Sequence, residues 1–319
     1  WLPNTSSSSS PTFLLAGIPG LEAAHVWLSI PFTCIHIPSF MGNCTILFVI
    51  RTDLSLHKPV YQFFSMLVIT SLGLSLSTMP AVMGVFWVSC REISFGACFA
   101  QLYFVHSFSF MESSVLLAMA FDLYVAIFYP LRYSSILTGA RIAKIGLAAL
   151  CRSFLRVLPS LFLLRRLPFC QCHVVSHTYC LHKDLVELAC ADVTFNSRYG
   201  LAVVILVVVL DPLLIVFSYI MICKTTASQK EHLKALNNCL PHIPMVLILS
   251  IPMSGWSMVH HFSKRASPSV HVLLANIYLL APPVLNPIIY SIKTKQNHRG
   301  FLQVLMPRRS FSPWHHSPW

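Results

Sequence analysis

Histidine and basic side chains gather within or beside a few of the long apolar runs of this sequence. They are His106, His177, His182, Lys183, His260, His261, Lys264 and Arg265. Around a partly dry pocket, such side chains would suit a small carboxylate, because it gains charge-assisted hydrogen bonds there. The alternative is that they are separate surface residues with no shared site. We expect at least His106 to converge with the group around His182.

The spacing of the reactive side chains gives no support for metal binding or catalysis. His, Cys and Asp do not recur at short intervals along one helix, as the ligands of a metal ion do. The sequence also has no nucleophile beside a base and no glycine-rich phosphate loop. We therefore expect no metal, no cofactor and no enzymatic activity.

Three carboxylates lie within apolar segments, where an ionisable side chain is a functional hypothesis by default. They are Glu112, Asp122 and Asp211. For Glu112, a structural hydrogen bond and a ligand contact are equally consistent with the sequence. Asp122 lies near the end of its segment and would be expected to pair with an Arg, yet the next residue is Leu123.

The composition shows what kind of elements must position these side chains. Of the 319 residues, 55% are hydrophobic and 10% are charged, whereas about 25% are charged in soluble domains. The mean hydropathy is +0.69. These values exclude a disordered chain and a soluble enzyme, and 11 Cys in 319 residues are too few for a disulfide-dense miniprotein. The sequence predicts an all-α membrane protein.

Seven apolar segments are each long enough to cross a bilayer, which takes roughly 20 residues. They cover residues 26–50, 60–88, 99–127, 142–164, 199–223, 239–260 and 270–292. Arg152 and Arg156 fall inside the fourth segment on one helix face, so they must turn into the bundle or reach an edge. We predict a seven-transmembrane helix bundle over residues 26–292, between an extracellular tail at 1–25 and a cytoplasmic tail at 293–319.

The distribution of basic residues predicts the orientation of this bundle. With the N-terminus outside, the cytoplasmic segments contain thirteen Lys and Arg and the external segments contain seven, as the positive-inside rule favours. Asn4 begins a glycosylation sequon in the N-terminal tail, which agrees. The formal charge of +12 comes without a long basic run, so nucleic acid is not the expected partner. The C-terminal tail has room for a short amphipathic helix, and it either lies on anionic lipid or is disordered.

Four cysteines in the predicted external segments are candidates for disulfides, because the outside of the cell is oxidising. They are Cys98, Cys170, Cys180 and Cys190. Three pairings are possible, and the spacing does not choose among them. A bridge from Cys98 to the loop between the fourth and fifth segments would hold that loop across the mouth of the bundle.

Short motifs occur in a fixed order along the seven segments. They are GN at 42–43, LHKPVY at 56–61, MAFDLYVAI at 119–127, SY at 218–219, KALNNC at 234–239 and PPVLNPIIY at 282–290. Over about residues 11–300 the chain resembles the vertebrate odorant receptors, which are rhodopsin-like G-protein-coupled receptors, and within them the class I or fish-like branch. Phrases similar to that branch are GIPGLE at 17–22, LRRLPFC at 164–170 and KTKQ at 293–296.

This resemblance implies a function and a binding site. Receptors of this kind bind small volatile or water-soluble molecules at the plasma membrane and activate a stimulatory olfactory G protein, which raises cyclic AMP. Class I members often bind acids, and a basic residue is common at the position of His261. The resemblance also implies two disulfides, Cys98 with Cys180 and Cys170 with Cys190. The ligand-binding residues that it implies are His106, Phe110, His182, Lys183, Ser257 and His261.

The resemblance also assigns a set of residues to activation and coupling. They are Asp122, Leu123, Tyr124, Tyr219, Asn286, Pro287 and Tyr290. Leu123 stands where the family has the Arg that engages the G protein, and Ser71 stands where the family has an Asp of a sodium-linked polar network. Lys58 replaces a Glu, Pro241 replaces a Ser, and the loop at 224–233 is a few residues short. We therefore hypothesise a receptor fold with poor or absent G-protein coupling.

A channel or transporter is the third interpretation of the same seven segments. Many transporters are built from repeated halves, but this sequence shows no repeat of span order or motif. It also shows no chain of acidic residues through the spans. Both features favour a receptor.

Overall fold

A computed structural model describes most of the chain. The described residues are 12–16, 25–88, 90–169, 174–225, 243, 246, 247 and 268–293. Among them, four helices are long and apolar enough to cross a membrane. These are α1 (His25–Thr52), α2 (Pro59–Trp87), α3 (Phe95–Phe128) and α5 (Gly139–Arg165). They match the first four segments predicted from the sequence.

The fifth and seventh predicted segments are also helical. The fifth consists of α7 (Thr194–Ile205), the π-helical turn η4 (Leu206–Leu210) and α8 (Asp211–Thr225). The seventh is α11 (Pro268–Lys293). Nearly all of the sixth segment, residues 239–260, lies outside the described residues.

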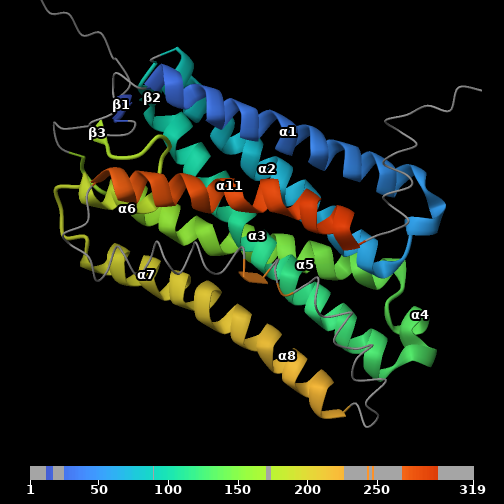
Figure 1. Cartoon of the computed structure of the whole chain (residues 1–319). Helices are drawn as coiled ribbons and strands as arrows, with labels where there is room; N and C mark the ends of the chain where they lie inside the picture. Colours follow the sequence, from blue (N-terminus) through green and yellow to red (C-terminus); the bar gives the residue numbers. More distant parts are fainter. Residues whose placement is uncertain are drawn as a thin grey trace, which may run out of the picture.

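Helix α3 is the central element of the bundle. It packs against α2, α5 and α8, and it lies among them in Figure 1. Ser94 caps its N-terminus, because the Ser94 Oγ accepts a hydrogen bond from the Ala97 N–H. Small buried side chains, including Ser107 and Ser113, let neighbouring helices approach closely, as is usual for helices that pack in a bilayer.

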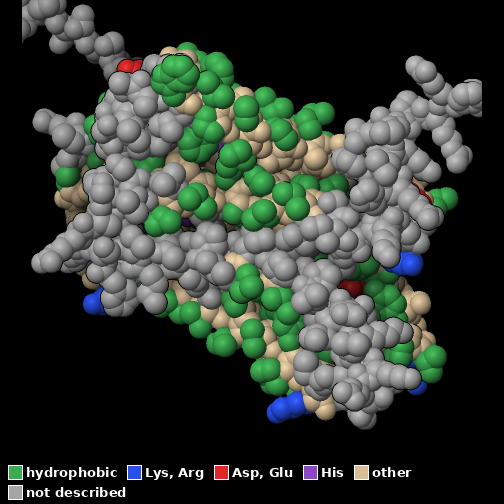
Figure 2. All heavy atoms as spheres, viewed as in Figure 1, with side chains coloured by type: hydrophobic (Ala, Val, Ile, Leu, Met, Phe, Trp, Pro, Cys, Tyr) green, Lys and Arg blue, Asp and Glu red, His purple; other side chains and the backbone are tan. Residues whose placement is uncertain are grey.

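The outside of the bundle is apolar along the length of the helices. Leu147, Leu155 and Phe162 on α5 and Phe217 on α8 keep 60–62% of their surface exposed. Figure 2 shows such hydrophobic side chains spread over the long helices, with Lys and Arg near the two ends. Water would penalise this surface, whereas the hydrocarbon of a bilayer matches it.

A small sheet covers one end of the bundle, which we call the sheet end (Figure 1). Strand β1 (Thr12–Leu15) pairs antiparallel with β2 (Glu92–Ser94) and parallel with β3 (Val174–Val175). Phe13 and Leu15 point inward and are buried, so this part of the predicted N-terminal tail is a packed strand. Helix α6 (His182–Glu187) lies at the same end.

The opposite end carries short connecting elements, and we call it the α4 end. It contains the 3-10 turns η2 (Leu54–Leu56) and η3 (Pro130–Arg132) and the short helix α4 (Tyr133–Ile136). Helix α2 begins there at Pro59, which suits a first helical turn because proline lacks an N–H to satisfy.

Close packing of α2 against α3 predicts an unequal effect of two similar substitutions. A Cβ at Gly73 would lie 2.5–2.7 Å from three ring carbons of Phe108, whereas a Cβ at Gly146 would meet only the flexible end of Met66. We expect Gly73→Ala to lower the free energy of unfolding by about 1–3 kcal/mol, and Gly146→Ala to cost less. Thermal unfolding of the two purified variants checks this, and equal melting temperatures would contradict it.

Candidate functional site

A cavity of about 360 Å³ lies at the sheet end, among α3, α5, α6, α7 and α11. Most of its lining is apolar, including Leu102, Val105, Val157, Val203 and Leu279. An apolar cavity of this size with a few polar groups is the usual form of a small-molecule site.

Four of the six predicted ligand residues line this cavity. His106 and Phe110 reach it from α3, and His182 and Lys183 reach it from α6. The other two, Ser257 and His261, lie outside the described residues. The structure therefore brings His106 and the loop histidine to one site, and their role in binding stays a prediction.

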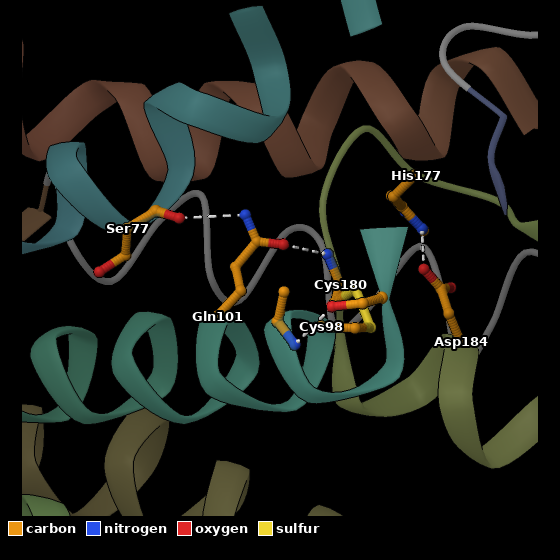
Figure 3. Close-up of a disulfide and its surroundings, with 8 residues drawn as sticks. Ser77, Cys98, Gln101, His177, Cys180 and Asp184 are labelled. Atoms are coloured by element: carbon orange, nitrogen blue, oxygen red, sulfur yellow. Dashed lines mark hydrogen bonds and ion pairs between the residues drawn. A yellow bond between two sulfur atoms is a disulfide. The ribbon is translucent and has the colours of Figure 1, made fainter. Parts of the chain in front are cut away.

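The loop before α6 is held over the cavity by a disulfide and by buried hydrogen bonds (Figure 3). Cys98 and Cys180 form the disulfide, with 5.5 Å between their Cα atoms, which confirms this predicted pair. Gln101 accepts a hydrogen bond from the Cys180 N–H at 3.0 Å and donates one to the Ser77 carbonyl at 3.0 Å. A loop anchored at this point has a fixed position above the bundle.

The second predicted disulfide is only partly visible. Cys190 is disulfide-bonded, and Cys170 lies outside the described residues, so its pairing with Cys190 stays a prediction. Close to Cys180, the His177 Nδ1 lies 2.7 Å from a carboxylate oxygen of Asp184 (Figure 3). This buried pair gives His177 a structural contact within the loop, and His177 is not part of the cavity lining.

The described lining of the cavity is electrically neutral, unlike the basic group expected from the sequence. The Lys183 Nζ lies 3.2 Å from the Glu187 Oε1, one turn along α6. Burial lowers the pKa of His182 to about 4, because desolvation disfavours the charged imidazolium. His182 is therefore neutral at pH 7. Four members of the basic group, His260, His261, Lys264 and Arg265, lie outside the described residues.

A polar network deeper in the bundle links α2, α3 and α11. The Ser71 Oγ donates to the Glu112 Oε1 at 2.8 Å, and the Asn286 Nδ2 donates to the Ser71 Oγ at 3.1 Å. Asn43 on α1 donates to the Pro283 carbonyl on α11 at 2.8 Å. Of the two roles that the sequence left open for Glu112, the structure shows a structural hydrogen bond.

A second network joins α3, α5 and α8 through one carboxylate. The Arg152 Nη2 lies 2.7 and 2.9 Å from the two Asp211 oxygens, and the Ser113 Oγ donates to Asp211 at 2.8 Å. Arg156 instead stacks its guanidinium 5.7 Å from the centre of the Phe110 ring. Both arginines thus contact side chains of neighbouring helices, Arg152 through Asp211 and Arg156 through the Phe110 ring. Asp211, the first residue after the π-helical turn η4, thereby anchors the start of α8 to α5.

Comparison with known proteins shows to which family this fold belongs. Residues 32–308 match the family described as "Olfactory receptor". The chain belongs to the olfactory receptor family. It is 58% identical to human olfactory receptor 51Q1 over 296 residues, which are 92% of this chain and 93% of the relative. It is 55% identical to human olfactory receptor 51G2 over 298 residues, covering 92% and 95%.

A solved receptor structure shares the architecture. The crystal structure of squid rhodopsin superposes with a TM-score of 0.69 at 18% identity, covering 90% of this chain and 81% of the rhodopsin. The olfactory receptor chain therefore has the seven-transmembrane fold of a G-protein-coupled receptor. Members of this family are receptors rather than enzymes, which confirms the expectation from the sequence.

The α4 end of this olfactory receptor contains the predicted coupling residues. The Asp122 Oδ1 accepts a hydrogen bond from the Tyr133 hydroxyl at 2.8 Å, whereas an Arg partner was expected from the sequence. Burial and the Asp122 charge raise the pKa of Tyr133, so its hydroxyl stays protonated and can donate. Leu123, Tyr124 and Tyr219 pack around the buried Ile222 of α8.

The structure describes only some of the other predicted coupling residues. Asn286 is buried, and Pro287 lies half-buried beside Gly42 of α1, 3.6 Å from the position of a Cβ there. Tyr290 belongs to α11, but its side chain lies outside the described part of the receptor, as do Pro241 and nearly all of the loop at 224–233. Asn4 also lies outside it.

Several residues at the cavity were missed by reasoning from the sequence. Tyr179, Glu187 and Gly200 line it, and the apolar lining residues carry no signal that separates them from other core residues. Glu187 could have been found, because it follows Lys183 by four residues on one helix face. A lone glycine in an apolar helix was a weaker signal for Gly200.

Proposed function

We propose that this chain is an odorant receptor of the plasma membrane that binds small odorants in the cavity at the sheet end. The observation that carries this proposal is the mostly apolar cavity of about 360 Å³, roofed by a disulfide-anchored loop, in a chain of the olfactory receptor family. In the orientation favoured by the basic residues and by Asn4, this cavity faces outside and the α4 end faces the cytoplasm. Bound odorant would then activate a stimulatory olfactory G protein and raise cyclic AMP.

The class of odorant depends on the head group that the cavity accepts. Carboxylic acids are the class expected from the resemblance. Because Lys183 pairs with Glu187, an acid would depend on basic residues outside the described part of the chain, such as His261. The apolar lining supports a small odorant with a mostly apolar body.

A second candidate function is a receptor fold that binds odorants but couples poorly. The observation that favours it is Leu123, which packs in an apolar cluster with Ile222 where the family has an Arg. No observation in the described residues favours a channel or transporter.

Cyclic AMP in cells that express the chain with a stimulatory olfactory G protein tests the proposal. The signal is normalised to the amount of chain at the surface, and the panel contains short carboxylic acids and neutral odorants. We expect at least one odorant to raise cyclic AMP in the parent or in a Leu123→Arg variant. If neither responds to a broad panel despite surface display, the proposal is wrong.

A further inference from the structure

We propose that His106 and His182 form a head-group site for an uncharged hydroxyl inside the cavity. The hydroxyl donates a hydrogen bond to one imidazole and accepts one from the other. This inference rests on the proposed odorant-binding function and names the class of ligand that the same cavity takes, namely a small alcohol with an apolar body.

The first observation is that both imidazoles have an unused ring nitrogen inside the cavity. The Nε2 atoms of His106 and His182 are buried and have no hydrogen-bond partner among the described residues. Both residues line the cavity, His106 from α3 and His182 from α6. A buried polar atom without a hydrogen-bond partner is destabilising, so a ligand that bonds to both atoms binds more tightly than one that bonds to neither.

The second observation is the charge of the site. Burial lowers the pKa of His182 to about 4, so at pH 7 its imidazole has one donor nitrogen and one acceptor nitrogen. Lys183 lies 3.2 Å from the Glu187 carboxylate, which offsets its positive charge at the cavity. A carboxylate would be ionised at pH 7 and would lose its hydration here, and the one cation among the described lining residues, Lys183, already faces the Glu187 carboxylate.

Among simple uncharged groups, a hydroxyl matches two such imidazoles best. A hydroxyl both donates and accepts, so it can satisfy a donor nitrogen on one ring and an acceptor nitrogen on the other. An ether or a ketone only accepts, and would leave one ring nitrogen without a partner. The rest of the lining, such as Leu102, Val157 and Leu279, is suited to an alkyl or terpene-like body.

The third observation is that both rings are held in place by neighbouring residues. A Cβ built at Gly200 of α7 would lie 3.1 Å from the Cε1 and 3.4 Å from the Nδ1 of His182. Because glycine has no Cβ, the His182 ring can lie directly against α7. The His106 ring stacks on Phe110 with 6.1 Å between the ring centres. Gly200 is therefore a positioning residue for the head-group site.

Ligand-induced changes in the melting temperature of the purified receptor in lipid nanodiscs test this proposal, because they do not depend on G-protein coupling. The probes are a primary alcohol, its methyl ether and the carboxylate of the same carbon chain, each titrated at pH 7. We expect the alcohol to bind about tenfold more tightly than the ether and more tightly than the carboxylate. Equal binding of alcohol and ether, or tighter binding of the carboxylate, would overturn the head-group assignment while leaving odorant binding intact.

Variants of the same receptor separate recognition from general stability. His182→Phe and His106→Phe should each remove most of the preference for alcohol over ether. Gly200→Ala should reduce that preference several-fold by displacing His182, whereas Gly96→Ala, outside the cavity and with nothing within 4 Å of the added Cβ, should leave it unchanged. A preference that survives both histidine substitutions would overturn the assignment. If no probe shifts the melting temperature of the parent while another odorant of the wider panel does, the head-group assignment is wrong and the proposed function stands.

Discussion

A Leu123→Arg variant is expected to give at least about tenfold more agonist-evoked cyclic AMP than the parent chain at equal surface amount. Leu123 packs against the apolar Ile222 of α8 and has no group that can pair with Asp122 or with a G protein. Asp122 already accepts a hydrogen bond from Tyr133, so its carboxylate is in place for an added Arg. Dose–response curves in cells with a stimulatory olfactory G protein check this.

A matched control distinguishes the added charge from a loss of packing. Leu123→Ala removes the apolar contact with Ile222 but adds no guanidinium, so we expect it to respond no better than the parent. A parent response equal to that of Leu123→Arg would show that the receptor couples without this Arg. The hypothesis of poor coupling would then be wrong.

An Asp211→Ala variant is expected to be strongly destabilised, by about 3 kcal/mol in the free energy of unfolding. Asp211 is buried and binds Arg152 at 2.7 Å, while Arg156 lies one turn further along the same helix. Removing the carboxylate leaves two arginines in the apolar part of the bundle without their described counter-charge. The melting temperature and the yield of receptor at the cell surface should both fall.

A double variant serves as the control for this prediction. Arg152→Met combined with Asp211→Leu removes both charges and keeps the apolar volume, so we expect it to be more stable than Asp211→Ala alone. If Asp211→Ala melts at the parent temperature, the ion pair does not stabilise the bundle. The structural role assigned to Arg152 would then be contradicted.

The helices could be predicted from the sequence because one physical requirement determines them. A segment that crosses a bilayer must be apolar and about 20 residues long, and the predicted segment 60–88 corresponds to α2 at Pro59–Trp87. Strand β1 was not predicted, because Thr12–Leu15 is ordered by pairing with β2 and β3, which lie far along the chain. The π-helical turn η4 also has no signature in its apolar sequence.

The site was predicted less completely, because its chemistry depends on burial and on distant partners. The sequence placed Arg152 either inside the bundle or at an edge, and it could not single out Asp211, which lies 59 residues away. The sequence grouped His182 with basic side chains, whereas burial lowers its pKa to about 4 and keeps the imidazole neutral at pH 7. The resemblance to a family supplied the connection between Cys98 and Cys180, which the spacing of cysteines left open.

Binding of an odorant to the purified receptor before and after the cavity is filled tests the central claim most directly. Ser160 is buried in the cavity wall on α5, and Ser160→Trp should occupy the space that an odorant needs, with Ser160→Ala as the matched control. We predict that an odorant raises the melting temperature of the parent and of Ser160→Ala, and that this shift is lost in folded Ser160→Trp. An unchanged shift in Ser160→Trp would show that odorants bind elsewhere and would contradict the assignment of this cavity.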